Sequence, residues 1–435
     1  MLDLKIENGT LVIPGIGLVR AGLGIRHGKI VLIARESMLP PAERVVDATG
    51  SHVIPGVIDP HVHLGYYRSL EDECLTESPS ALAGGITTVG CHVYPTAVPL
   101  EETFLDMAQR ASRHLYTDVF FHVILTRPEQ LDDIPLYAST LGVTSFKFYT
   151  CAVHGDPVAV SDALLFDAFK RIALLDRSAI ACVHAQNDSM IAGATRLLFE
   201  AKAEKTLVDW ANTHPAAAEE EATIRIAFLA GRAGVPLYFV HLTRQVTASR
   251  MREIKRQYDR AYAECLSPHL SLTRNNGKGL LAKITPPLQG QEDVDGLWGA
   301  VDDDTIDVLA TDHSARPKPL LGTHLPVLLT EGYRNRGIDL CRLVDRMTRR
   351  PAQLFGLYPR KGTISIGSDA DLVLVDLDTE VDVAARNLHS VASFSLHDGR
   401  RLIGWPVMTI KSGLVAVQNQ ELKVGPGIGS YLTRC

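Results

Sequence analysis

Short hydrophobic runs, rich in β-branched and aromatic residues, recur through the middle of the chain and alternate with amphipathic stretches. Such runs predict strands, and nearly continuous apolar runs are typical of parallel strands that are covered on both faces. The pattern predicts eight strands in this part of the chain: Gly56–His63, Ile86–Val93, Asp118–Leu125, Thr144–Thr150, Ala179–His184, Pro236–Leu242, Arg260–Cys265 and Ile306–Asp312.

Stretches rich in Ala, Leu, Glu and Arg lie between most of these strands and predict helices. The clearest are Glu101–His114, Ser161–Leu175, Ala216–Ala233 and Val246–Tyr258. Strands that alternate with helices over about 300 residues predict an α/β fold, a (β/α)8 TIM-like barrel. A doubly wound open sheet is the alternative, but it would be expected to carry a glycine-rich phosphate turn. The chain has neither GxGxxG after a strand nor GxxxxGK[ST].

Both ends of the chain have a different texture, with short alternating strands broken by Gly, Asn and Asp. The N-terminal runs are Leu4–Glu7, Thr10–Ile13, Leu23–Arg26 and Ile30–Ala34, and the C-terminal runs are Asp371–Asp376, Pro406–Lys411 and Leu414–Gln418. We predict one small β-sandwich domain built from residues 1–55 and 362–435, and a catalytic barrel of residues 56–361.

Six polar side chains fall at or near the C-terminal ends of five predicted barrel strands: His61, His63, Lys147, His184, His241 and Asp312. In a parallel barrel these strand ends meet at one rim, where barrel enzymes place their active sites. A single histidine at a strand end is more often a hydrogen-bonded rim residue than a metal ligand. The coincidence over five strands favours the metal ligands.

The chemistry of the six residues agrees with a metal centre. His61 and His63 are two residues apart, so a strand directs both side chains to the same face. Imidazole is the commonest protein ligand for zinc-like metals, and a carboxylate completes the set. Two such ions about 3.5–4 Å apart form the arrangement that many hydrolases use.

Lys147 is unusual in this set, because an ammonium group would be repelled by two divalent cations. It could instead pair with Asp312 or with another carboxylate at the rim. Reaction with carbon dioxide would turn it into a carbamate, N6-carboxylysine, whose two oxygens could each bind one metal ion. We carry this modification as a hypothesis, since a sequence cannot reveal it.

Composition and charge indicate which partners and which cellular location to expect. The formal net charge is -6 and no long basic run is present, so nucleic acid and anionic membranes are not expected partners. Seven cysteines are scattered singly without a CxxC pair, as is typical of the reducing cytoplasm. Met1–Asn8 lacks a signal-peptide layout, and no apolar stretch is long enough to cross a bilayer. We expect a cytoplasmic protein.

The chain also resembles the cyclic amidohydrolases of the amidohydrolase superfamily, that is, hydantoinases, dihydropyrimidinases, allantoinases and dihydroorotases. The resemblance extends over nearly the whole chain. The segments that carry it are Pro55–Leu64, Ala83–Val89, Phe146–Lys147, Val183–Ala185, Val240–Leu242, Thr285–Leu288, Thr311–His313 and Gly367–Leu372.

The resemblance implies a role for each ligand. It implies that His61, His63 and Asp312 bind one divalent ion, that His184 and His241 bind the other, and that carboxylated Lys147 bridges them. It also implies zinc as the metal and a homo-oligomer, a dimer or a tetramer. The metals would activate a bridging water, and Asp312 would move its proton to the departing ring nitrogen.

The substrate positions depart from each subfamily. Gly65 stands where dihydroorotases usually carry an arginine that holds a carboxylate, and Cys91–Pro95 replaces a Met-Pro-Asn-like run. Ala152 stands where hydantoinases carry a tyrosine that donates to the oxyanion. Tyr149, on the same strand face as Lys147, could substitute for it. Thr285 matches a serine that contacts the substrate ring in hydantoinases.

The reaction we expect is hydrolytic opening of a small cyclic amide, imide or ureide, as in hydantoinases and dihydropyrimidinases. Allantoinase or dihydroorotase activity is one alternative. A non-catalytic scaffold like the dihydropyrimidinase-related proteins is another, although such a protein would be expected to lose ligands. A single-metal deaminase on the same barrel is a third, although that class typically lacks the bridging lysine. His269 is a further possible oxyanion donor, although a core or loop histidine is the favoured interpretation.

Overall fold

The structure is a computed structural model, and it describes residues 1–93, 100–153, 158–175, 179–201, 205–316 and 318–434. The chain comprises two compact units. The first unit comprises Met1–Cys91, Met107–Phe120 and His313–Leu432, and the second comprises His92–Asp106, Phe121–Asp312 and Thr433–Cys435.

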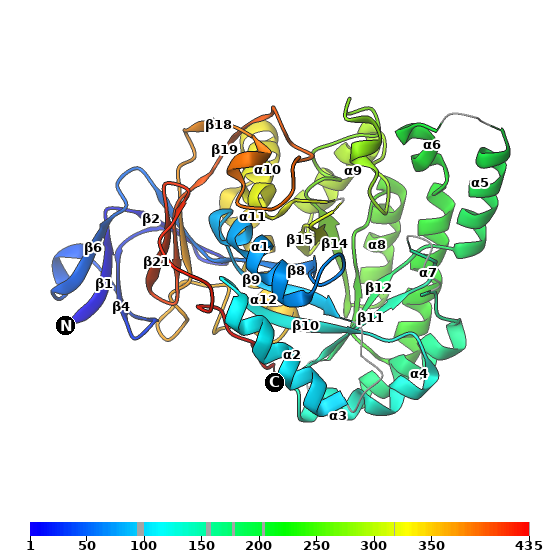
Figure 1. The fold of residues 1–435 in the computed structure, drawn as a ribbon, viewed down its shortest axis with the longest axis horizontal. Helices are drawn as coiled ribbons and strands as arrows, with labels where there is room; N and C mark the ends of the chain where they lie inside the picture. Colours follow the sequence, from blue (N-terminus) through cyan, green and yellow to red (C-terminus); the bar gives the residue numbers. More distant parts are fainter. Residues whose placement is uncertain (94–99, 154–157, 176–178, 202–204, 317, 435) are drawn as a thin grey trace. The chain divides into compact units, whose positions relative to one another are not determined.

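A sheet of parallel strands runs through the middle of the chain (Figure 1). Its strands follow the order β15-β14-β13-β12-β11-β10-β9-β8-β16, and within the described residues no pair closes the sheet between β15 and β16. Their bounds are β8 Val57–His63, β9 Ile86–Val93, β10 Asp118–Ile124, β11 Ser145–Tyr149, β12 Ile180–His184, β13 Leu237–Phe239, β14 Ala261–Leu266, β15 Val308–Ala310 and β16 His313–Ser314.

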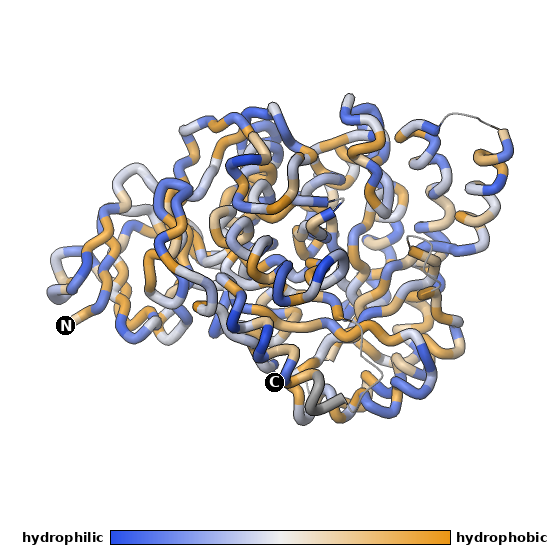
Figure 2. The backbone as a smooth tube through the Cα atoms, viewed as in Figure 1, coloured by the Kyte–Doolittle hydropathy of each residue, from blue (hydrophilic) through white to orange (hydrophobic). Residues whose placement is uncertain are grey.

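The eight predicted barrel strands are all present. Nearly all of their residues are buried, which accounts for their nearly continuous apolar runs. Every residue of β10 is buried, and its backbone is largely orange in Figure 2. Four strands end earlier than the sequence predicts: β10 and β11 end one residue early, at Ile124 and Tyr149, and β13 and β15 end further from the predicted residue. β13 ends at Phe239 and β15 at Ala310, so His241 and Asp312 each lie two residues beyond a strand.

Helices alternate with these strands, as predicted. Ala216–Ala233 matches α7 at both ends, and its C-terminus is set by Gly234, which has a left-handed backbone that glycine adopts without steric cost. The α-helices are α1 Leu70–Ala83, α2 Leu100–His114, α3 Ile134–Ser139, α4 Asp162–Ala173, α5 Asp188–Ala201, α6 Leu207–Asn212, α7 Ala216–Ala233, α8 Gln245–Gln257, α9 Gln291–Asp302, α10 His324–Leu328, α11 Leu340–Met347 and α12 Arg349–Leu354.

Strands from both ends of the chain form the β-rich part of the first unit. Four strands pair in the order β5-β4-β1-β6, and seven pair in the order β22-β21-β20-β17-β7-β2-β3. Their bounds are β1 Leu2–Glu7, β2 Thr10–Ile13, β3 Gly17–Arg20, β4 Gly22–Arg26, β5 Lys29–Ala34, β6 Ala42–Asp47, β7 His52–Pro55, β17 Leu372–Val375, β20 Pro406–Lys411, β21 Leu414–Gln418 and β22 Glu421–Leu422. A separate two-stranded sheet pairs β18 Glu380–Asp382 with β19 Arg401–Ile403.

One hydrophobic core joins the two larger sheets of this β-rich part. It contains Leu4 and Ile25 from the four-stranded sheet and Leu11, Leu372 and Ile410 from the seven-stranded sheet. Two layers of sheet around one core are the arrangement of a β-sandwich. The predicted domain boundaries, after residue 55 and before residue 362, stay a prediction. Among the described residues, no helix combines the length and the hydrophobicity that crossing a membrane requires.

Candidate metal centre

The second unit contains four of the six predicted metal ligands, all on consecutive or neighbouring strands. Lys147 lies on β11, His184 ends β12, and His241 and Asp312 follow β13 and β15. All four side chains are buried, with at most 5% of each exposed. The rings of His184 and His241 are edge to face, with centroids 4.4 Å apart.

Two of the other three residues, Lys147 and Asp312, affect the pKa of His184. Burial, followed by the positive charge of Lys147, lowers the pKa of His184 to about 3, while the charge of Asp312 acts in the opposite direction. His184 is therefore neutral at pH 7, and a neutral imidazole is the form that binds a metal. Lys147 and Asp312 are both close enough to His184 to influence its charge.

His241 has a left-handed backbone, with φ of 42°. Its peptide N–H donates to Glu264 Oε1 at 2.9 Å, and Tyr238 donates its hydroxyl to Glu264 Oε2 at 2.7 Å. Burial, followed by the charge of Glu264, raises the pKa of Tyr238, so this tyrosine remains a donor. Asp312 has the same kind of backbone, with φ of 54°. Left-handed residues other than glycine are uncommon and cluster at functional sites.

The first unit contains His61 and His63, which lie at the end of β8. Their ring centroids are 5.4 Å apart, and the peptide N–H of His61 donates to Asp59 Oδ1 at 3.2 Å. The strand therefore presents both imidazoles together, as the HxH spacing predicts. The union of this pair with the four residues of the second unit in a single centre stays a prediction.

The predicted substrate residues lie in varied surroundings. Tyr149 is on β11, and its ring centroid is 5.0 Å from Lys147 Nζ and 5.6 Å from the His184 ring.

Thr285 is 7% exposed. Ala152 is exposed, and its backbone N–H donates to Asp188 Oδ1 at 2.8 Å. His269 is 2% exposed, with Nε2 at 3.1 Å from the Pro286 carbonyl oxygen, as suits a core histidine.

Gly65 has a left-handed backbone with φ of 85°, and a Cβ there would lie 3.2 Å from Leu70. An arginine at this position would be strained, which agrees with the departure from the dihydroorotase pattern. Within the run Cys91–Pro95, Tyr94 and Pro95 lie outside the described residues.

Three buried polar residues near these strand ends were not among the predicted site residues. His92 on β9 and His122 on β10 stack with ring centroids 4.6 Å apart. Gln186 lies two residues after His184 and contacts its ring nitrogen Nε2 at 2.9 Å. The sequence offered a signal for His92 and His122, because each interrupts an apolar strand.

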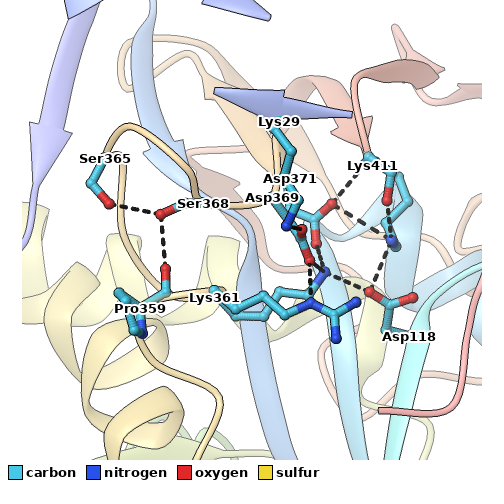
Figure 3. Close-up of polar contacts among 11 residues, drawn as sticks. Lys29, Asp118, Pro359, Lys361, Ser365, Ser368, Asp369, Asp371 and Lys411 are labelled. Atoms are coloured by element: carbon cyan, nitrogen blue, oxygen red, sulfur yellow. Dashed lines mark hydrogen bonds and ion pairs between the residues drawn. The ribbon is translucent and has the colours of Figure 1, made fainter. Parts of the chain in front are cut away.

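Three aspartates of the first unit also lie close enough together to be a geometric candidate for a cation site: Asp118, Asp369 and Asp371. Two buried lysines already lie among these carboxylates. Lys361 Nζ is 2.5 Å from Asp118 and from Asp371 and 2.8 Å from Asp369, and Lys411 Nζ is 2.9 Å from Asp118 (Figure 3). This group is an ion-pair cluster, and its ammonium groups make it unsuitable for a metal ion.

The four residues of the second unit fit a divalent metal ion better. Two buried imidazoles and a carboxylate are typical ligands of zinc-like ions. Lys147 fits only if it is no longer cationic, and carboxylation would meet that requirement. The donor set therefore agrees with metal binding, provided that Lys147 is modified.

Comparison with known proteins identifies the class to which this fold and these residues belong. Residues 52–413 match the Amidohydrolase family, and the chain belongs to that family.

Its relatives narrow the class further. The chain is 30% identical to L-hydantoinase of Paenarthrobacter aurescens, over 100% of this chain and 98% of the relative. It is also 30% identical to D-hydantoinase of Ralstonia pickettii, over 100% and 99%.

Solved structures of hydantoinases and dihydropyrimidinases have a similar fold over nearly the full length of this chain. L-hydantoinase (dihydropyrimidinase) from Arthrobacter aurescens has a TM-score of 0.91 and 30% identity, with 100% of each chain covered. Dihydropyrimidinase from Brevibacillus agri NCHU1002 has a TM-score of 0.89 and 25% identity, with 99% of this chain and 98% of that chain covered. The predicted fold class, a TIM-like barrel with a small β-sandwich, is confirmed, and so is the predicted cyclic amidohydrolase family.

Proposed function

We propose that this protein hydrolyses a C–N bond in a small cyclic amide, imide or ureide, with the ring-opening chemistry of a hydantoinase or dihydropyrimidinase. The observation that carries the proposal is the buried group formed by Lys147, His184, His241 and Asp312 in a chain whose full-length relatives are named hydantoinases. The retained ligands favour a hydrolase over a non-catalytic scaffold.

In this proposal His61, His63 and Asp312 would hold one divalent ion, and His184 and His241 would hold the other. Carboxylated Lys147 would serve both ions. When bound, the two ions supply an activated water and polarise the ring carbonyl. We assign zinc to both positions, because neutral imidazoles and a carboxylate suit that ion.

Asp312 acts as the proton carrier. Its carboxylate accepts a proton from the attacking water and passes that proton to the ring nitrogen as the C–N bond breaks. Tyr149 donates its hydroxyl to the developing oxyanion, in place of the tyrosine that is absent at Ala152. Thr285 contacts the substrate ring.

In this proposal Lys147 is carboxylated to N6-carboxylysine. Its neutral amine attacks carbon dioxide, an N–C bond forms, and one proton is released, which leaves a carbamate anion. Intact-protein mass measurement under non-denaturing, bicarbonate-containing conditions tests this step. Unmodified Lys147 in the metal-loaded protein would contradict it.

The decisive experiment measures metal content and turnover on a panel of ring substrates. We expect about two zinc ions per chain and activity on hydantoins or dihydrouracil within a panel that also contains allantoin, dihydroorotate and simple cyclic imides. Relatives named for both L- and D-hydantoins have the same identity, so both enantiomers of a 5-substituted hydantoin belong in the panel. Dihydroorotate as the best substrate would contradict the interpretation of Gly65, and one metal ion per chain would favour the deaminase.

Replacing Asp312 with Asn tests the proton carrier. An amide cannot take up the proton from water, so Asp312→Asn should lower kcat by at least about 10³-fold while the circular dichroism spectrum stays unchanged. Retained turnover in this variant would exclude Asp312 from the role.

A cytoplasmic location and a homo-oligomeric state, a dimer or a tetramer, are also part of the proposal. Six cysteines of the described chain are free thiols, which suits a reducing compartment. Sedimentation analysis of the purified protein tests the oligomeric state.

A further inference from the structure

Gln186 lies in the loop that follows β12 and is 3% exposed. Its side-chain oxygen Oε1 is 2.9 Å from His184 Nε2. The thiol of Cys151, on the loop after β11, donates to the same oxygen at 3.9 Å. The amide oxygen therefore faces two donors.

This contact determines which nitrogen of His184 carries hydrogen. An amide oxygen only accepts hydrogen bonds, so Nε2 must donate and must carry the proton of the neutral ring. The lone pair is then on Nδ1. A histidine that binds a metal uses the nitrogen without hydrogen, and the group that accepts its other N–H fixes the ring orientation.

The backbone that carries Gln186 is held to the neighbouring strand end. The Gln186 N–H donates to Thr150 Oγ1 at 3.0 Å, and that hydroxyl donates to the Gln186 carbonyl oxygen at 2.8 Å. The Thr150 N–H also donates to the His184 carbonyl oxygen at 3.1 Å. Thr150 directly follows β11, the strand of Lys147, so this contact fixes the end of β12 relative to the end of β11.

We propose that Gln186 is a positioning residue, which accepts the Nε2 hydrogen of His184 and thereby presents Nδ1 of that ring as the metal-binding nitrogen. Thr150 holds the backbone in the conformation that makes this contact. The inference rests on the proposed function, because it concerns how this chain prepares a ligand for the metal.

Two substitutions of Gln186 separate acceptance of the hydrogen bond from packing. Gln186→Leu has similar size and no acceptor, whereas Gln186→Glu keeps an oxygen at the same place. We expect Gln186→Leu to weaken zinc binding about 10- to 100-fold in competition with a chelator and to change the visible spectrum of the cobalt-loaded protein. Gln186→Glu should remain within about threefold of wild type. Thr150→Val should weaken binding by a smaller factor.

Gln130→Leu is the matched control. Gln130 is also a buried glutamine of the second unit, but its side-chain oxygen accepts from the backbone N–H groups of Thr126 and Arg127. This variant should lose thermal stability and keep its zinc affinity and cobalt spectrum. If Gln186→Leu fails to fold, Gln186→Met replaces it in the same comparison.

Different outcomes reject different claims. Equal zinc affinity in wild type and Gln186→Leu would overturn the positioning role alone. Equal losses in Gln186→Leu and Gln186→Glu would overturn it as well, because acceptance of the hydrogen bond would then not matter. A wild-type chain that binds no divalent metal would overturn the proposed function together with this inference.

Discussion

Glu264 lies on β14, is fully buried, and holds the backbone of His241 through one carboxylate oxygen while the other accepts from Tyr238. Replacing Glu264 with Leu would leave the His241 N–H and the Tyr238 hydroxyl without this acceptor. Each buried group that loses its partner costs about 1–3 kcal/mol. We therefore expect Glu264→Leu to lower the free energy of unfolding by about 3 kcal/mol in urea denaturation.

Tyr238→Phe is the matched variant, because it removes one hydroxyl and leaves the contact to His241 in place. It should cost about 1 kcal/mol and leave zinc affinity unchanged. Glu264→Leu should also weaken zinc binding, since His241 would lose its left-handed backbone. Equal effects of the two substitutions would exclude a role of Glu264 in holding His241.

His214 gives the stability of the second unit a pH dependence. It is 5% exposed, and burial is the main cause that lowers its pKa to about 4. In the unfolded chain the pKa of His214 is about 6.5, so below this pH the unfolded chain binds a proton that the folded chain does not bind. The protein therefore loses stability as pH falls from 6.5 toward 4. The slope is about 1.4 kcal/mol per pH unit.

The measurement compares wild type with His214→Gln in urea denaturation at pH 7 and pH 5. Wild type should lose about 2 kcal/mol more than the variant over this interval. The difference between the two proteins removes the contribution of other buried histidines, such as His184. An identical loss in both proteins would mean that His214 is not the group that titrates.

At the scale of elements, the sequence predicts the bounds of continuously buried strands well. It predicts strand ends poorly where a left-handed backbone conformation sets them. Ile86–Val93 and Ala216–Ala233 match β9 and α7 at both ends. The runs toward His241 and Asp312 do not, because each of these residues has a left-handed backbone that ends the strand early. Such a conformation depends on distant partners such as Glu264, and no local pattern records it.

The glycines near the C-terminus show the same limit, because the sequence from Gly425 to Gly429 reads as a plain loop. In the structure a Cβ at Gly429 would lie 1.9 Å from the Thr117 carbonyl oxygen. On either side, the Gly427 N–H donates to the Leu115 carbonyl oxygen at 2.9 Å, and the Val119 N–H donates to the Ser430 carbonyl oxygen at 2.9 Å. Glycine permits this close backbone approach.

Gly429→Ala should therefore destabilise the pairing of the C-terminal segment, by about 1–3 kcal/mol. Hydrogen exchange at the Val119 amide should become faster. Gly425→Ala is the control, because no atom lies within 4 Å of a Cβ at that position, and its effect should stay within about 0.5 kcal/mol. Equal exchange rates in the two variants would show that the close approach is not needed.

At the scale of the whole chain, the predicted metal ligands and the ion-pair cluster differ in how far the sequence could reveal them. His63 and His184 end strands of one parallel sheet, and His61 and Lys147 lie two residues before strand ends, so strand counting alone predicts a shared rim. The positioning groups, Gln186 and Glu264, required the structure. So did the cluster around Lys361, whose members come from residues 29, 118, 360–371 and 411 and have no common pattern.

Lys361 is 2% exposed and pairs with three carboxylates, so its removal tests how much this cluster stabilises the chain. Lys361→Met would leave buried carboxylates with less compensation. The loss of one partner from a buried ion pair costs about 3–5 kcal/mol. Lys423→Met removes an exposed pair with Glu421 and should cost at most about 1 kcal/mol. Urea denaturation at pH 7 measures both.

The effect of Lys361→Met should shrink in acid. Burial alone would raise the pKa of Asp369, but the Lys361 ammonium and the Lys29 hydrogen bond hold it below its usual value, and Lys361 and Lys411 do the same for Asp371. The stability from these carboxylates is present above their unfolded pKa of about 4 and is lost as pH falls further. Near pH 3 wild type should therefore have lost part of this charge-dependent stability. The difference in free energy of unfolding between wild type and Lys361→Met should then be smaller than at pH 7. A difference between the two proteins that stays constant from pH 7 to pH 3 would mean that Lys361 stabilises the chain by packing of its methylene groups instead of by its charge.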